Sequence, residues 1–291
     1  KKLSLAVAVA ATLVSGVASA YTTAVPADGV LVPNVIHNTV ADTTAVGVIN
    51  HAATPVIVYW TFFDEDSNHI TDGQFPMTGG DYYPFVWSEE SGLGLENRRG
   101  YLTFHVGDST GAMTVAADQI SAAAFQLNAA DGDAVFVPTF PIVDADNFTP
   151  DNLTLLDGSS YATINGAAAA VLNTVDMRYE MNSDWTSMIT LWATAGLATS
   201  RTVNMWDDEQ NRKSVNFDCD KEELCFIDPT SILGRPADFT RGYIRLETQY
   251  ISDATVAEGG PAGSGSFVSY TTVQSTAFDA TQTVLNTHLL P

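Results

Sequence analysis

Three oxygen-bearing side chains, Asp64, Asp66 and Asn68, have the spacing that opens an EF-hand calcium loop. The sixth position of such a loop requires glycine and is His69, and the twelfth requires glutamate and is Phe75. A solvated hairpin tip is therefore the favoured interpretation, because Asp, Ser and Asn accept local backbone hydrogen bonds. The same three side chains are the calcium candidate, in which case other loops must supply the missing ligands.

An aromatic segment follows, and Tyr82 and Trp87 are its candidate glycan-binding residues. Aromatic rings stack on the C–H faces of sugars, and the neighbouring carboxylates of Asp81 and Glu89 have the chemistry to bind hydroxyl groups. The alternative is that these rings pack in a core, which is the usual place of aromatic side chains in a β-sandwich.

Catalytic signatures are absent from the sequence. The five histidines stand in no known motif, and the chain contains no G-x-S-x-G elbow, H-E-x-x-H helix or phosphate-binding loop. Carboxylates are numerous, but nothing singles out a pair for glycoside hydrolysis. We therefore predict no catalysis and no cofactor apart from the calcium alternative, with a carboxylate-dependent hydrolase as the third interpretation.

The charge balance excludes two classes of partner. Asp and Glu number 34 against 12 Lys and Arg, so the formal net charge is −22. Nucleic acids and anionic membrane surfaces would be repelled, since both require Lys and Arg to neutralise phosphate. Charged residues make up only 16% of the chain and hydrophobic residues 45%, which indicates a folded protein.

The two cysteines, Cys219 and Cys225, are close together in the sequence. In an exported protein this spacing predicts a local disulfide. A metal site would need further ligands nearby, and a redox pair is typically C-x-x-C. A loop this short gains little chain entropy, so the bridge is expected to fix a turn.

The segments that carry these residues have the alternating pattern that predicts β-strands. In the central run Val56, Val58, Trp60 and Phe62 fall on one face, which we assign to the core. Strand signals recur about every 8–12 residues without a long helical period, which predicts an all-β, antiparallel sandwich architecture.

A second, fainter copy of the pattern follows in the same order. Its identities fall at turns as well as at core positions, which favours two tandem modules over coincidence. The second copy places Arg201 where the first has Val58, which puts its core register in doubt. The recurring pairs are Phe63 with Trp206, Asn68 with Asn211, Arg99-Gly100-Tyr101 with Arg241-Gly242-Tyr243, and 46–49 with 188–191.

The N-terminal segment reads as a secretory signal, with Lys1 and Lys2, an apolar stretch over 3–14, and the small residues Ala18-Ser19-Ala20. We expect the mature form to be exported to the periplasm, the cell surface or the medium, without a membrane span. The predicted organisation is a signal peptide at 1–20, a first module at 21–143, a linker at 144–158 and a second module at 159–291.

The apolar run ending in Phe62-Phe63-Asp64-Glu65-Asp66-Ser67-Asn68 and the later Arg99-Gly100-Tyr101-Leu102 strand resemble uncharacterised exported bacterial proteins with tandem immunoglobulin-like modules. The resemblance covers about residues 30–140 and, more faintly, 170–290. It implies a fold and a location and no activity. We expect a structural or interaction protein that presents loops and sheet edges to a protein or glycan partner, with self-association left open; the alternative is a calcium-assisted carbohydrate-binding protein.

Overall fold

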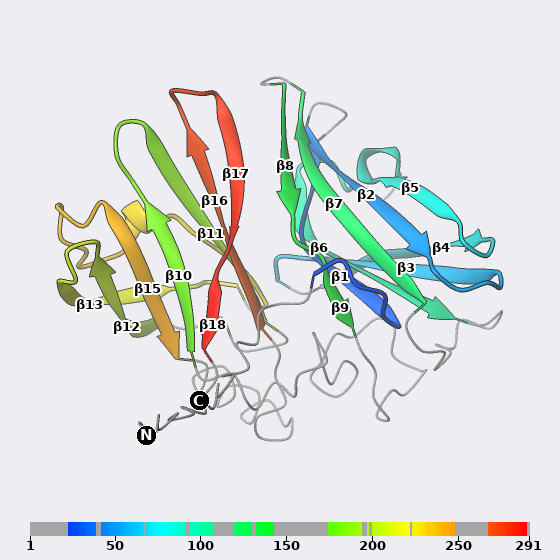
Figure 1. Ribbon diagram of the computed structural model, residues 1–291, viewed down its shortest axis with the longest axis horizontal. Helices are drawn as coiled ribbons and strands as arrows, with labels where there is room; N and C mark the ends of the chain where they lie inside the picture. The colour runs from blue at the N-terminus through cyan, green and yellow to red at the C-terminus, as the bar shows by residue number, and fades with distance from the viewer. Residues whose placement is uncertain are drawn as a thin grey trace, which may run out of the picture.

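A computed structural model describes most of the 291-residue chain (Figure 1). The described residues are 23–38, 42–66, 68–90, 94–107, 119–129, 132–142, 174–193, 197, 200–221, 223–247 and 267–289. They form strands and short 3₁₀ turns and contain no α-helix, so the predicted all-β, antiparallel class is confirmed. The predicted signal peptide at 1–20 and linker at 144–158 lie outside the described residues.

The strands of the first half form one continuous sheet that is folded into two layers. One layer has the order β4-β3-β6-β1, with β9 also paired to β1, and the other has the order β5-β2-β7-β8. Strands β1 and β2 pair only at their adjoining ends. The elements are β1 (Gly29–Asn38), β2 (Asp42–Asn50), β3 (Val56–Asp64), β4 (His69–Met77), β5 (Tyr82–Val86), η1 (Trp87–Glu89), β6 (Arg98–Gly107), β7 (Ile120–Asn128), β8 (Asp133–Val137) and β9 (Phe140–Ile142).

The second half contains two separate sheets, with the orders β13-β12-β15-β10-β18 and β14-β11-β16-β17. The strand order in each layer matches that of the first half, with β10 in the place of β1 and β18 in the place of β9, but β10 and β11 do not pair as β1 and β2 do. The elements are β10 (Thr174–Glu180), β11 (Trp185–Ala193), β12 (Ser200–Asp207), β13 (Arg212–Asp218), β14 (Leu224–Ile227), η3 (Pro229–Ser231), β15 (Arg241–Glu247), β16 (Phe267–Ser275), β17 (Ala280–Leu285) and β18 (Thr287–Leu289).

The central strand β3 fills the first core as its alternation predicts. Val56, Val58, Trp60 and Phe62 are buried in the largest apolar cluster of the first half. In the second half Arg201 does point inward and is buried, and its Nη1 donates to the carbonyl oxygen of Leu197 at 2.9 Å. The register of β12 is therefore kept, because the guanidinium has a backbone acceptor where it enters the core.

The repeated Arg-Gly-Tyr sequence has a steric cause. Gly100 pairs with Asp64, and a Cβ atom on Gly100 would lie 1.9 Å from the carbonyl oxygen of Phe63. A Cβ on Gly242 would lie equally close to the carbonyl oxygen of Trp206, and the φ of Gly242 is +151°. Only glycine fits between these strands without moving the backbone.

We expect Gly242→Ala to lower the free energy of unfolding by about 2–4 kcal/mol, through backbone strain and overpacking. Gly47→Ala is the matched control, because its new Cβ would meet only the side chain of Tyr82, which is exposed and free to move. The control should cost less than about 1 kcal/mol. Urea denaturation compares the two variants, and equal losses would contradict the steric explanation.

Candidate functional site

The two halves pack against each other through a third apolar cluster. In Figure 1 they lie side by side, with β8 of one half facing β17 of the other. The first half contributes the outer face of its β9-β1-β6-β3 layer, and the second half contributes the outer face of β14-β11-β16. The cluster consists of Leu31, Phe63, Tyr101, Phe140 and Ile142 from the first half and Trp192, Leu224 and Val268 from the second.

Tyr101 lies at the centre of this interface. Its ring meets the ring of Trp192 edge-on, with centroids 5.6 Å apart, and its hydroxyl donates to the carboxylate of Glu223. The guanidinium of Arg99 lies 4.5 Å above the ring of Phe226. The interface thus combines apolar burial with a buried phenol–carboxylate bond and a cation–π contact.

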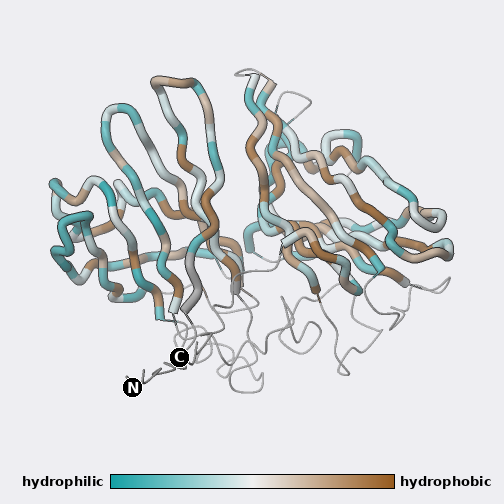
Figure 2. Tube along the Cα trace, viewed as in Figure 1, coloured by the Kyte–Doolittle hydropathy of each residue, from teal (hydrophilic) through white to brown (hydrophobic). Residues whose placement is uncertain are grey.

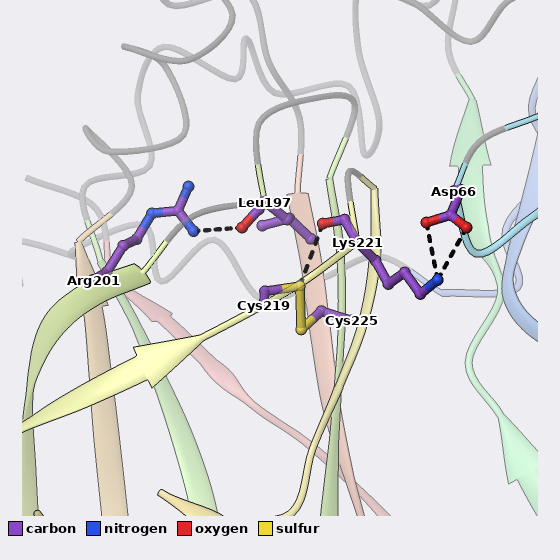
Figure 3. The surroundings of a disulfide bond; sticks show 6 residues. All are labelled: Asp66, Leu197, Arg201, Cys219, Lys221 and Cys225. Atoms are coloured by element: carbon purple, nitrogen blue, oxygen red, sulfur yellow. Dashed lines mark hydrogen bonds and ion pairs between the residues drawn. A yellow bond between two sulfur atoms is a disulfide. The ribbon is translucent and has the colours of Figure 1, made fainter. Parts of the chain in front are cut away.

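The disulfide predicted between Cys219 and Cys225 is present, with Cα atoms 5.9 Å apart. The loop that it closes reaches across to the first half (Figure 3). Lys221 Nζ lies 2.9 Å from both carboxylate oxygens of Asp66, and the hydrogen bond to Asp66 raises the pKa of Lys221. Besides fixing a turn, the bridge therefore holds a loop that contacts the opposite half.

The acidic turn of the calcium candidate is a hydrogen-bonded hairpin. Asp64 Oδ1 accepts from the backbone N–H groups of Asp66 at 3.0 Å and Asn68 at 2.9 Å. Asp66 pairs with Lys221, as described above. Among the described residues no three His, Cys, Asp or Glu side chains are grouped as metal ligands would be. The hairpin accounts for Asp64 and Asp66 without a metal, and calcium binding by these residues stays a prediction.

The second half repeats this turn at the rim of a groove. Asp207 Oδ1 accepts from the backbone N–H groups of Glu209 at 3.0 Å and Asn211 at 2.8 Å. Burial opposes ionisation of Asp207, but the hydrogen bonds from Asn211 and Glu209 hold its pKa below the ordinary value. This rim is therefore negatively charged at neutral pH.

The groove itself has a volume of about 660 Å³ and lies over β10, β12 and β15. Tyr243 lines the groove, and its paired residue Trp206 stacks against it, with centroids 4.9 Å apart and planes 8° from parallel. Both rings are half-buried. We call this pair the aromatic shelf.

Arginine–aspartate ion pairs lie around the aromatic shelf. Arg245 binds Asp176 with two hydrogen bonds of 2.7 Å, and this contact raises the pKa of Arg245. Arg241 Nε lies 2.5 Å from Asp208 Oδ2. The guanidinium of Arg245 also lies 5.4 Å from the Trp206 ring centroid. The groove thus combines the Tyr243 ring with carboxylates and guanidinium groups, while Trp206 stacks on Tyr243 and Arg245 lies over both rings.

The aromatic shelf occupies the position that the first half uses for its interface. Phe63 pairs with Tyr101 as Trp206 pairs with Tyr243, and their rings also stack, with centroids 5.1 Å apart. Phe63 and Tyr101 are covered by the second half, whereas Trp206 and Tyr243 are only half-buried and Tyr243 lines the groove. In Figure 2 the turns at the outer end of the second half (left) are coloured hydrophilic, and hydrophobic segments run through the strands of both halves.

A second accessible surface is the outer face of β5-β2-β7, which is apolar. Ile49, Tyr82 and Phe125 are exposed there by 38, 60 and 43%. We call these three residues the apolar face. Trp87 lies elsewhere: it is fully buried and packs on Trp60 at 5.7 Å. Of the two predicted glycan-binding rings only Tyr82 is at the surface, because η1 turns the Trp87 ring into the core.

Sequence reasoning did not select the aromatic shelf or its ion pairs as a site. The signal was present, since Trp206 and Tyr243 are the counterparts of Phe63 and Tyr101 in the repeat. The sequence comparison could not show that Phe63 and Tyr101 are covered by the second half while Trp206 and Tyr243 are not. Within the described residues there is no helix with the length and apolar character needed to cross a membrane.

No family model, curated protein or solved structure matches this chain. The two accessible surfaces, and the interface that they resemble, are therefore the features of the molecule that bear on its function.

Proposed function

We propose that the protein is an exported structural or interaction protein that presents its sheet faces and loops to a protein or glycan partner and performs no catalysis. The observation that carries this proposal is the half-buried aromatic shelf, in which Tyr243 lines a groove and Trp206 stacks on it, beside the Arg245–Asp176 ion pair. Aromatic and Arg side chains dominate the binding energy of protein interfaces. The chain would consist of two tandem immunoglobulin-like modules, and the shared order of strand pairing in the two halves supports this.

Export is part of the proposal. A disulfide between Cys219 and Cys225 suits an oxidising compartment. The charged and apolar pattern of residues 1–20 is typical of a secretory signal. The periplasm, the cell surface and the medium are all compatible with these two features.

Carbohydrate binding is the second candidate function. Stacked rings beside Arg245 and Asp176 match the needs of a sugar, whose C–H faces stack and whose hydroxyl groups bind charged side chains. The exposed ring of Tyr82 offers a further stacking surface. Calcium assistance through Asp64, Asp66 and Asn68 belongs to this candidate.

Replacing Trp206 by alanine should test the proposal. We expect the variant to lose binding to cell-envelope proteins or polysaccharides at least tenfold, because a central aromatic residue contributes more than about 1.4 kcal/mol. Trp185→Ala is the matched control, since Trp185 is a half-buried tryptophan on β11, in the sheet that does not carry the groove.

Binding is measured by retention on purified envelope fractions and on a polysaccharide panel, with and without millimolar calcium. Retention of polysaccharide alone, strengthened by calcium, would favour the second candidate. Equal retention of Trp206→Ala and the unaltered protein, or no retention of either, would contradict the proposal. Glycan hydrolysis abolished by one Asp or Glu to Ala change would overturn the absence of catalysis.

A further inference from the structure

The interface between the halves joins two surfaces, and each surface has an accessible counterpart elsewhere in the chain. On one side of the interface are Trp192 and Leu224, which are paired across β11 and β14. Their counterparts in the first half are Ile49 and Tyr82, paired across β2 and β5 in the same register. Trp192 and Leu224 are fully buried, whereas Ile49 and Tyr82 are exposed.

On the other side of the interface are Phe63 and Tyr101, whose counterparts form the aromatic shelf. The molecule therefore contains one closed interface and accessible counterparts of its two central residue pairs. The flanking positions differ, because Leu31 of the interface corresponds to Asp176 and Val268 corresponds to Ser121. The apolar face corresponds to the surface that docks, and the aromatic shelf corresponds to the surface that receives it.

We infer that the protein associates with itself head to tail, with the apolar face of one copy docked on the aromatic shelf of the next. This inference rests on the proposed function as an interaction protein and names the partner as a second copy of this chain. Such an interface is heterologous, because two different patches meet. Unless the rotation closes a ring, it produces an open filament.

Side chains around the two surfaces repeat the polar contacts of the closed interface. Tyr101 donates its hydroxyl to Glu223, the residue before Leu224. Tyr243 is the counterpart of Tyr101, and the residue before Tyr82 is Asp81. The backbone places these two acids alike, because the carbonyl of Asp81 accepts from Asn50 and that of Glu223 accepts from Ala193, both at 2.9 Å. The carboxylate of Asp81 already accepts three hydrogen bonds within its turn, from Thr78 and the backbone N–H of Tyr82, so Tyr243 of the next copy would donate to its remaining acceptor position.

The same comparison explains why the apolar face remains at the surface of a strongly acidic protein. Contiguous apolar patches on a protein surface mark interaction sites. The charge of −22 opposes association of two copies, since like charges repel. Salt screens this repulsion, so association should increase with ionic strength.

The test is sedimentation velocity of the purified protein between micromolar and submillimolar concentrations, in 0.05 and 0.5 M NaCl. We expect species larger than a dimer at high concentration, with at least tenfold tighter association in the higher salt. Ile49→Glu blocks the apolar face, and Trp206→Glu blocks the aromatic shelf. Arg178→Glu serves as a second block of the groove, because Arg178 is an exposed lining residue whose replacement leaves the aromatic shelf packed.

Each variant alone should be monomeric, and an equal mixture of an apolar-face variant and a groove variant should form dimers and nothing larger. A dimer that survives Trp206→Glu and Arg178→Glu would overturn head-to-tail docking in favour of symmetric pairing of the apolar faces. A monomer at every concentration and salt would overturn self-association. That result would leave the proposed function standing if the envelope-binding assay still depends on Trp206.

Discussion

Trp60→Ala is expected to lower the free energy of unfolding by about 3–5 kcal/mol, because it empties a large volume in a closed core. Trp60 is only 6% exposed and packs edge-on against Phe85, with centroids 5.4 Å apart. Gly73 on β4 lies against its ring, and a Cβ there would be 2.6 Å from Cζ2 of Trp60. Backbone on one side and aromatic rings on the other leave little room for the site to collapse around the smaller side chain.

The loss should extend to the second half. Trp192 and Leu224 are buried in the cluster that the second half forms with the first, so unfolding of the first half would expose part of them to water. Hydrogen exchange during urea denaturation can follow β3 and β12 separately, and we expect both to lose protection in one transition. Trp185→Ala, on a half-buried residue of the second half, should cost much less. Persistence of β12 after β3 has exchanged would show instead that the predicted modules at 21–143 and 159–291 unfold independently.

Acid should weaken the protein through one buried histidine. His105 is fully buried beneath a stacked Tyr59 ring at 5.5 Å, and neither of its ring nitrogens has a hydrogen-bond partner among the described residues. Burial lowers the pKa of His105 to about 3. The unfolded chain, with a histidine pKa of about 6.5, takes up a proton between these values that the folded chain does not. Stability is therefore fully present above about pH 6.5 and falls by at most about 1.4 kcal/mol per pH unit below it.

Replacement of His105 by phenylalanine should remove this contribution, since phenylalanine keeps a planar ring beside Tyr59 and does not titrate. The measurement is the free energy of unfolding in urea at pH 7.5, 6, 5 and 4, for the unaltered protein and the variant. The difference between them should grow as pH falls, because carboxylates contribute equally to both. His69→Phe is the control, as His69 is partly exposed and pairs with Asp72. Parallel pH dependences for His105→Phe and the unaltered protein would contradict the role of His105.

Much of the inner architecture follows from alternation in the sequence. The inward face of β3, the hairpin at Asp64 and the bridge between Cys219 and Cys225 were all expected. One alignment was shifted by one residue, because 46–49 was matched to 188–191. The pairing shows that Val46 corresponds to Ile189, since both point inward and pair with inward residues of β5 and β14. A shift of one residue in a strand reverses every side chain, which is why exposed Met188 could not match buried Val46.

The outer faces could not be predicted in the same way. Phe63 and Trp206 have the same place in the repeat, but only the first is covered by the other half. Alternation tells which side of a strand faces its own core and says nothing about contacts between sheets distant in the sequence. Trp87 shows the same limit at short range. Its place after β5 does not tell whether the ring faces the core or the solvent, and it is η1 that turns the ring into the core.

The closed interface also has a consequence for the order of events in biosynthesis. A chain is synthesised from its N-terminus, and domains generally fold as they emerge. The first half can form before Trp192 and Leu224 exist, and during that interval the outer surface around Phe63 and Tyr101 has nothing to cover it. Nascent chains with such a surface tend to stick to one another. The surplus of acidic residues is then expected to act before the protein is finished, because like charges on incomplete chains repel one another.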